Sequence, residues 1–469
     1  MNARIAARAL AFAAALALSG CVLPPKDTPQ ITQTPDIALG LGTTNAPDVD
    51  ALWWHQYGDA QLDRLTDAAL EHNPTLESAL ARIHLAQAQV QATAATRQPN
   101  TALTAEATRQ RYPENYIYPP PLAGNTYWAG DLSVRFSWDL DLWGRQRALI
   151  NSMTASADAT RLDAAAARLA ITASLAEAYL DLDRAYALAD IAAQSEEQRR
   201  RILDITRKRI DAGLDTNVEL REAEAAVPQA ELGRLQAEAA RDVAIHRVVA
   251  LTGGSAADYA GIARPTLAVE TALVVPDSLP ADLLGRRPDI LAARARAESA
   301  KSLKTAARAS FFPNVNLAAF AGFEAIGLDN LTEWGSRTIG AGPALSLPIL
   351  SAPRLKAQYR GAIAAEDLAV STYNGAVVTA IQQTSDQLTY VRSSAQQLDK
   401  ARQALAAAEE AYRLAQKRYQ AGLTNYLVVL TTESQVLNAR TSVVDVLHSQ
   451  ALARIGLLLA VGGNFSSRA

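Results

Sequence analysis

The chain has 469 residues, 49% of them hydrophobic, so it is long enough to bury a substantial core. Its formal net charge of -3 gives no general attraction to nucleic acid, and no nucleic-acid partner is expected. A single cysteine excludes an intrachain disulfide and a thiolate cluster. The 5 histidines lie too far apart for a metal site, so we expect no metal and no cofactor.

Residues 1–20 have the pattern of a secretory signal peptide. Two arginines precede an apolar run from Ala9 to Leu18, and small residues follow it. The next residue, Cys21, ends the sequence Leu-Ser-Gly-Cys, which has the form of a bacterial lipobox. We predict that Cys21 is lipidated, because several acyl chains on one residue anchor a protein stably. Residues 21–50, rich in Pro, Thr and Asp, are predicted to form an extended strap.

The rest of the chain contains two copies of one plan. Four landmarks recur in the same order: NPTL at 73–76 and RPDI at 287–290, QPN at 98–100 and FPN at 312–314, AGL at 212–214 and 421–423, and LTGG at 251–254 and AVGG at 460–463. The first two pairs are offset by 214 positions and the last two by 209. Offsets of this size indicate a duplicated domain-sized unit rather than a solenoid.

We therefore predict a first repeat at 51–254, a linker at 255–279, a second repeat at 280–463 and a tail at 464–469. Each repeat is expected to run helix, two strands, very long helix, turn and long helix. The predicted strands cover about 101–112, 128–143, 314–324 and 335–350, and the helices that follow them cover about 145–212, 216–252, 354–421 and 425–461. Each very long helix would span roughly 100 Å.

The two very long helices carry an apolar residue at nearly every seventh position. The positions are Leu182, Ala189, Glu196, Leu203 and Ile210 in the first, and Val391, Leu398, Leu405, Tyr412 and Tyr419 in the second. This sevenfold spacing predicts coiled-coil-like packing against neighbouring helices.

The strands alternate in the manner of a membrane barrel. From Asp131 to Leu142 every second residue is apolar, and the pattern repeats from Thr338 to Ile349; it is weaker from Val315 to Phe323 and weakest from Thr101 to Gln110. Twelve alternating residues suit a strand with one face to lipid and one to a lumen. Aromatic residues at the strand ends predict two interfacial girdles: Tyr112, Tyr127, Trp128, Phe323 and Trp334 at one end, and Trp143, Phe311 and Phe312 at the other. No apolar run of 18 residues follows the signal, so we expect no transmembrane helix.

Four strands cannot close a barrel, and an open edge in lipid leaves backbone groups unpaired at several kcal/mol each. The chain is therefore expected to share a barrel with copies of itself. Two copies would give an eight-stranded barrel, and side chains would nearly fill its interior. Three copies would give twelve strands and could leave a passage. A conduit thus favours three or more copies.

Several stretches in this order resemble the TolC-like outer membrane factors, in particular the NodT-type efflux lipoproteins. They include Trp53-Trp54, the segments 284–290, 312–315 and 342–349, and Arg418-Tyr419 with Ala421-Gly422. The resemblance implies a mainly α fold with a membrane β-barrel portion: a homotrimer with a 12-stranded barrel in the lipid of the bacterial outer membrane and a helical tunnel in the periplasm. It also implies two partners, a periplasmic adaptor (membrane fusion) protein and an inner-membrane pump of RND or MFS type.

The resemblance places the working residues at the two helix–turn–helix tips. Members of the family meet the adaptor through a small Gly-Leu motif, which falls here on Gly213, Leu214 and Asp215 and on Gly422, Leu423 and Thr424. The glycines also suit a tight turn. A periplasmic gate is expected at Arg209, Asp211 and Tyr419, with Asp215 beside it. The sequence departs from relatives that have an acidic residue and then an arginine where it has Thr431 and Ser434. The bonds that latch the gate in those relatives therefore cannot be carried over to this chain.

Two other functions fit part of this pattern. A periplasmic adaptor lipoprotein also has a signal, an anchor and a helical hairpin, but it would need β-rich lipoyl-like segments and one hairpin. An outer-membrane duct for protein secretion would share the architecture. An enzyme has little support, because the sequence contains no Walker-type loop, no His-Glu-x-x-His and no Gly-x-Ser-x-Gly.

Overall fold

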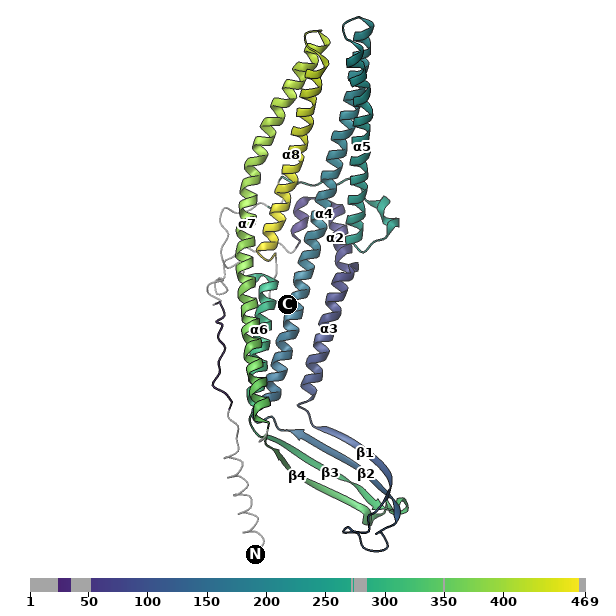
Figure 1. The fold of residues 1–469 in the computed structure, drawn as a ribbon, viewed down its shortest axis with the longest axis vertical. Coiled ribbons are helices and arrows are strands. Elements are labelled where there is room, and N and C mark those ends of the chain that lie inside the picture. The colour runs from purple at the N-terminus through teal and green to yellow at the C-terminus, as the bar shows by residue number, and fades with distance from the viewer. Residues whose placement is uncertain (1–23, 35–51, 271–272, 274–284, 349–350, 464–469) are drawn as a thin grey trace. The chain divides into compact units, whose positions relative to one another are not determined.

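The computed structural model describes residues 24–34, 52–270, 273, 285–348 and 351–463 (Figure 1). The predicted signal peptide at 1–20, Cys21 and the tail at 464–469 lie outside this part of the chain. Most of the predicted strap and part of the linker lie outside it as well. The chain divides into two compact units, which are described separately.

The helices and strands follow one order twice (Figure 1). The first copy has α3 (Pro74–Ala95), β1 (Asn100–Arg111), β2 (Thr126–Asp139), α4 (Arg145–Asp211) and α5 (Asn217–Leu251). The second copy has α6 (Pro288–Ala309), β3 (Asn314–Ile326), β4 (Arg337–Ser346), α7 (Ala352–Gln420) and α8 (Tyr426–Ala460). The short helices η2 (Trp53–Tyr57) and α2 (Ala60–His72) precede the first copy, and η3 (Ala256–Gly261) follows α5. The corresponding long helices have nearly equal lengths, 67 and 69 residues for α4 and α7 and 35 residues for both α5 and α8.

The first unit holds one antiparallel sheet with the strand order β1-β2-β3-β4. Its register brings the apolar members of all four strands to one face, since Val134 lies opposite Leu103 on one side and Ala321 on the other. The remaining members of this apolar face include Ala105, Leu132, Phe136, Trp138, Leu317, Ala319, Phe323, Ile339, Ala341 and Leu345. The opposite face is mostly polar or small, and one row across it joins Glu106, Asp131 and Glu324. The predicted alternation thus extends through the whole sheet.

Two strands end earlier than their alternation suggested. The apolar pattern runs to Leu142, but β2 ends at Asp139 and Leu142 is exposed. The reason is local: the Asp141 carboxylate accepts the backbone N–H groups of Gln146 and Arg147, at 2.8 and 3.0 Å. These bonds satisfy donors of the first turn of α4 and so fix the end of the strand. Similarly, β4 ends at Ser346, and Ile349 lies outside the described residues.

The predicted aromatic girdles need a correction at two positions. Trp128, Trp334 and Trp143 are exposed, as residues facing a membrane interface would be. Phe311 is instead 1% exposed and packs with Leu355, Tyr359 and Ile363 in a small core. Tyr112 is likewise buried, against Tyr118 and Tyr127. Sequence proximity to a strand end does not distinguish a side chain that packs inward from one that faces outward.

A short extended segment before the first helix runs along α7. Asp27 pairs with Arg360 at 2.8 Å, and the backbone N–H groups of Gln30 and Ile31 donate to the Asp367 carboxylate at 2.9 and 3.0 Å. Three strap residues thus advance beside about two turns of helix, as an extended chain should. The strap is therefore tied to the first unit from Asp27 to Ile31.

The second unit contains α5, α8, the parts of α4 and α7 that form hairpins with them, and a core around Trp53, Trp54 and Tyr179. The sevenfold positions face inward: Leu182, Leu398 and Tyr419 are among the buried residues. Helix α8 is long and apolar enough to cross a membrane by length and composition alone, although a core helix passes the same test. Its Arg440 and Asp445 form ion pairs with α7 and α4, which identifies α8 as a packed element of this unit.

Candidate functional site at the hairpin tips

The two hairpins close with the same backbone turn. Gly213 and Gly422 adopt positive φ angles of 71° and 76°, a region that only glycine enters without strain. At the first tip the N–H groups of Gly213 and Leu214 donate to the carbonyls of Ile210 and Arg209, and the second tip has the same pair of bonds. This pattern caps the last carbonyls of α4 and α7. The glycines therefore have a structural role whatever else the tips do.

Beside the first turn, charged and aromatic side chains join the two hairpins. We call Thr206, Arg209, Asp215 and Tyr419 the tip cluster. Arg209 Nε and Nη2 donate to the two carboxylate oxygens of Asp215 at 2.8 and 2.9 Å. Its Nη1 donates to the Tyr419 carbonyl at 2.7 Å, and its guanidinium lies 4.5 Å from the centre of the Tyr419 ring. The Tyr419 hydroxyl donates to Asp215 at 2.7 Å and shares a hydrogen bond with Thr206.

The tip cluster is sheltered from solvent, which strengthens its charged bonds. The Arg209 and Asp215 side chains are only 11% and 7% exposed. Hydrogen bonds from Arg209 hold the pKa of Asp215 below its usual range. The hydrogen bonds to the Asp215 carboxylate in turn raise the pKa of Arg209. Burial raises the pKa of Tyr419 to about 12, so its hydroxyl stays protonated and remains a donor at neutral pH. The cluster is therefore fully bonded at physiological pH.

The structure places the sequence-predicted gate residues in two groups. Arg209 and Tyr419 meet, and Asp215, predicted as a tip residue and neighbour, joins them. Asp211 does not: it is exposed and, among the residues that the structure describes, has no ion pair or hydrogen bond of its side chain. It is the last residue of α4. Sequence position alone could not distinguish these two aspartates.

The remaining tip residues present apolar surface. Leu214 and Leu423 are 62% and 67% exposed, and Thr424 is partly buried. Further apolar residues close to the turns are also exposed, namely Val218, Leu427 and Val428. Large apolar side chains grouped at the end of an element commonly mark an interaction surface.

A functional candidate that the sequence reasoning missed lies about two turns into α8, the helix that follows the second tip. Within the part of the chain that the structure describes, the side chains of Thr431 and Ser434 hydrogen-bond to carbonyls of their own helix alone, at Leu427 and Leu430. Between them Glu433 is fully buried and forms an ion pair with Arg199 of α4. The available signal was its spacing: Glu433 lies seven residues after Tyr426, on the same buried stripe of α8.

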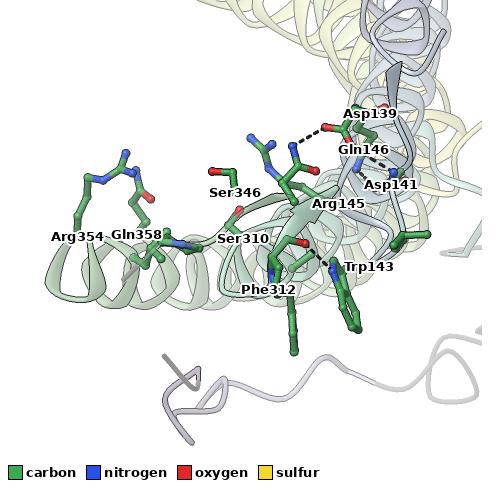
Figure 2. A pocket seen from close by; sticks show the side chains of 16 residues that line it. Asp139, Asp141, Trp143, Arg145, Gln146, Ser310, Phe312, Ser346, Arg354 and Gln358 are labelled. Atoms are coloured by element: carbon green, nitrogen blue, oxygen red, sulfur yellow. Dashed lines mark hydrogen bonds between the residues drawn. The ribbon is translucent and has the colours of Figure 1, made fainter. Parts of the chain in front are cut away.

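A hollow of about 310 Å³ lies where strands and helices of the first unit join (Figure 2). Figure 2 shows Asp139, Asp141 and Trp143 on one side and Arg354 and Gln358 on the other. The carboxylates are engaged in holding the connections: Asp141 accepts backbone N–H groups of α4, and Asp139 accepts from Asn314. The Trp143 indole donates to the Pro313 carbonyl at 2.7 Å. The arrangement fixes the strand–helix junction and offers no free acid–base pair.

Among the described residues no group of three or more His, Cys, Asp or Glu side chains could hold a metal ion.

A model of the family described as outer membrane efflux protein matches residues 65–254 and 279–463, which together cover most of the chain. The fusaric acid resistance protein FusA of Burkholderia cepacia is 34% identical over 74% of this chain and 67% of its own length.

Solved structures show the same fold. The outer membrane protein VceC of Vibrio cholerae is 34% identical, with a TM-score of 0.83 over 89% of this chain and 100% of that one. The outer-membrane channel OprN is 26% identical, with a TM-score of 0.82 over 94% and 99%. These similarities confirm the predicted fold class and efflux function. The chain belongs to the outer membrane efflux protein family and is an outer-membrane channel component of an efflux system.

Proposed function

We propose that three copies of this chain form one exit duct, with a shared 12-stranded barrel in the outer membrane and the helices in the periplasm. The observation that carries this proposal is the four-stranded sheet. In the described part of the chain, β1 and β4 each have a strand neighbour on one side only. Each unpaired backbone group in hydrocarbon costs several kcal/mol, so an apolar sheet with two open edges needs further copies. Three sheets close into a barrel that leaves a passage.

Two neighbouring residues of β2 test the membrane assignment, because they lie on opposite faces. Phe136 belongs to the apolar face and Ser137 to the polar face. An arginine facing lipid near the midplane costs roughly 2–4 kcal/mol, whereas a lumenal arginine stays solvated. Phe136→Arg should therefore lower the amount of heat-resistant trimer in outer-membrane fractions, and Ser137→Arg should leave it unchanged. Equal tolerance of both would show that this strand does not cross the membrane with these faces.

The helices supply a second argument for assembly. On α5, the exposed apolar residues Val218 and Leu232 lie two heptads apart, and Leu235 and Val243 continue the same side. Helix α7 also exposes Leu368, Val378 and Tyr390. Heptad-spaced apolar residues on a helix surface are typical of coiled-coil contacts. Neighbouring copies would cover these surfaces and form the tunnel wall.

The tips are the proposed contact with the periplasmic adaptor, through which an inner-membrane pump of RND or MFS type would deliver small toxic compounds. Leu214 and Leu423 present apolar surface on turns whose backbone is already satisfied. Burial of each leucine would contribute about 1.5–3 kcal/mol to docking, and a trimer offers each site three times. Gly213, Asp215, Gly422 and Thr424 would shape the same surface.

The tip cluster is the proposed gate latch. Arg209 and Asp215 belong to the first hairpin and Tyr419 to the second, so their bonds resist separation of the hairpins. Each charged hydrogen bond contributes about 1.5–3 kcal/mol. Thr431 and Ser434 bond to carbonyls of their own helix and so do not connect the hairpins. The tip cluster supplies a connection in their place. Asp211, which shares none of these bonds, is not proposed as part of the latch.

The strap supports a lipid anchor at Cys21. Cys21 lies six positions before Asp27, a reach of about 20 Å in an extended chain. Helix α7 extends only about 12 Å from Arg360, the partner of Asp27, to its first residue. An acylated Cys21 could therefore reach the end of the sheet, where α7 begins. Cys21→Ser should yield uncleaved or soluble precursor, whereas an unmodified Cys21 in the mature wild-type protein, detected by mass spectrometry, would refute the anchor.

The alternatives have less support. A periplasmic adaptor would have one hairpin, and this chain has two with a four-stranded sheet. Protein secretion would need the same duct but a different pump, and the family described as efflux proteins favours small compounds.

A further inference from the structure

The buried pair Arg199–Glu433 connects the first hairpin to the second at a different level from the tip cluster. Arg199 Nε lies 2.8 Å from Glu433 Oε2, with the side chains 15% and 1% exposed. Arg199 is the charged partner of Oε2, whereas Oε1 has no hydrogen-bond partner among the described residues. A buried carboxylate with one oxygen left without a partner is costly to ionise. Glu433 therefore occupies an environment that disfavours its charge.

The surroundings of Glu433 are aromatic and apolar. Tyr412 of α7 and Tyr426 of α8 belong to the core cluster around it, together with Val429 and Val436. The ionisable groups that face this cluster are Arg199 and Arg201 from α4, Glu222 from α5, Tyr412 and Tyr419 from α7, and Tyr426 from α8. Burial raises the pKa of Glu433 above its usual range, and the nearby Arg199 offsets only part of this effect. Its counterpart in the first repeat, Glu224, has no such site: it is 32% exposed and pairs with Arg207 and Arg221.

The coupling between proton binding at Glu433 and the packing of α4 on α8 gives the direction of the pH effect. If α4 and α8 move apart, water reaches Glu433 and its pKa returns towards the usual value. A proton then binds more tightly to the packed arrangement than to the separated one, and a ligand favours the state that binds it more tightly. Acid should therefore favour packing of α4 on α8, and the packing should weaken as the pH rises through the raised pKa. The lowered pKa of Asp215 keeps the tip cluster ionised over this range, so it does not share the effect.

We propose that Glu433 is a proton-binding site that makes the contact between the two hairpins pH-dependent, tightest in acid. This inference deepens the gate proposed above and rests on it. The pH of the periplasm would in this way set how readily the two hairpins separate, independently of the adaptor.

The test uses the full-length protein in lipid nanodiscs with spin labels on α4 and α8. Ala193 and Asn438 are exposed positions on these helices and can be replaced by cysteine. In the wild type, the short-distance population should be largest in acid and should decrease as the pH rises through the raised pKa of Glu433. Glu433→Gln, which mimics the protonated carboxyl, should remove this pH dependence and stay in the short-distance state. Arg199→Gln removes the cation that lowers the pKa, so it should move the midpoint to higher pH by about one unit or more.

Currents through planar bilayers, measured on the same samples, separate this inference from the proposed duct. Absence of current with the expected distance changes would refute the duct and leave the proton site supported. A pH dependence that persists unchanged in Glu433→Gln, or a wild-type distance that does not respond to pH, would overturn the inference. If Glu433→Gln does not assemble, Arg199→Gln decides, since an unchanged midpoint in that variant would equally overturn it.

Discussion

The two hairpin tips have the same backbone and different chemistry. Both end in a glycine with positive φ, and both have an arginine four residues before it. Arg209 of the first tip is bonded within the tip cluster, whereas its counterpart Arg418 is exposed. Asp215 corresponds to Thr424, which carries no charge. The two copies thus share the turn, which the backbone demands, whereas the bonded arginine–carboxylate pair is present in the first copy alone among the described residues. The contacts between hairpins, rather than the turns, distinguish the two copies.

The largest effect is expected from a charge on the apolar second tip. Leu423→Asp would bring an unpaired charge into the docked surface, at a cost of several kcal/mol per site. Drug resistance conferred by the complete pump and cross-linking to the adaptor should be lost, with the amount of heat-resistant trimer unchanged. Leu214→Asp should have a smaller effect, because the exposed Asp211 already presents a carboxylate at the first tip. Loss of the trimer together with resistance in Leu423→Asp would mean that the tip is a folding element.

The second-largest effect should distinguish Arg209 from its counterpart in the second hairpin, Arg418. Arg209→Ala removes the paired hydrogen bonds to Asp215 and the bond to the Tyr419 carbonyl, worth about 1.5–3 kcal/mol each. The closed form should become less populated by a factor of about ten or more, which single-channel conductance measures. Arg418→Ala is the matched control and should conduct like the wild type. Equal conductance of the two variants would exclude the latch.

A smaller effect distinguishes the two aspartates of the first tip. Because the pKa of Asp215 is lowered in the folded protein, its contribution to closure is present above its usual pKa and is lost only as the pH falls through the lowered value. Asp215→Asn should raise conductance at neutral pH, though less than Arg209→Ala. Asp211→Asn should change nothing, since Asp211 is exposed. A leak from Asp211→Asn as large as that from Asp215→Asn would contradict the assignment.

The sequence predicted features that depend on repetition. The duplication, the sevenfold spacing of α4 and α7 and the alternation from Leu132 to Phe136 each recur along the chain, so single exceptions do not obscure them. It did not predict features set by one contact. The end of β2 depends on the bonds of Asp141, and the burial of Phe311 depends on Tyr359 of a distant helix. Glu433 was missed for the same reason, because its partner Arg199 lies more than two hundred residues away.

The central claim, that three chains share one barrel, is tested most directly by native mass spectrometry of the complex extracted from outer membranes. The account predicts a mass equal to three mature chains, each carrying acyl groups at Cys21. A complex that contains a single chain, folded and inserted in the membrane, would contradict it, because the two edges of the sheet would then have to be satisfied in some other way.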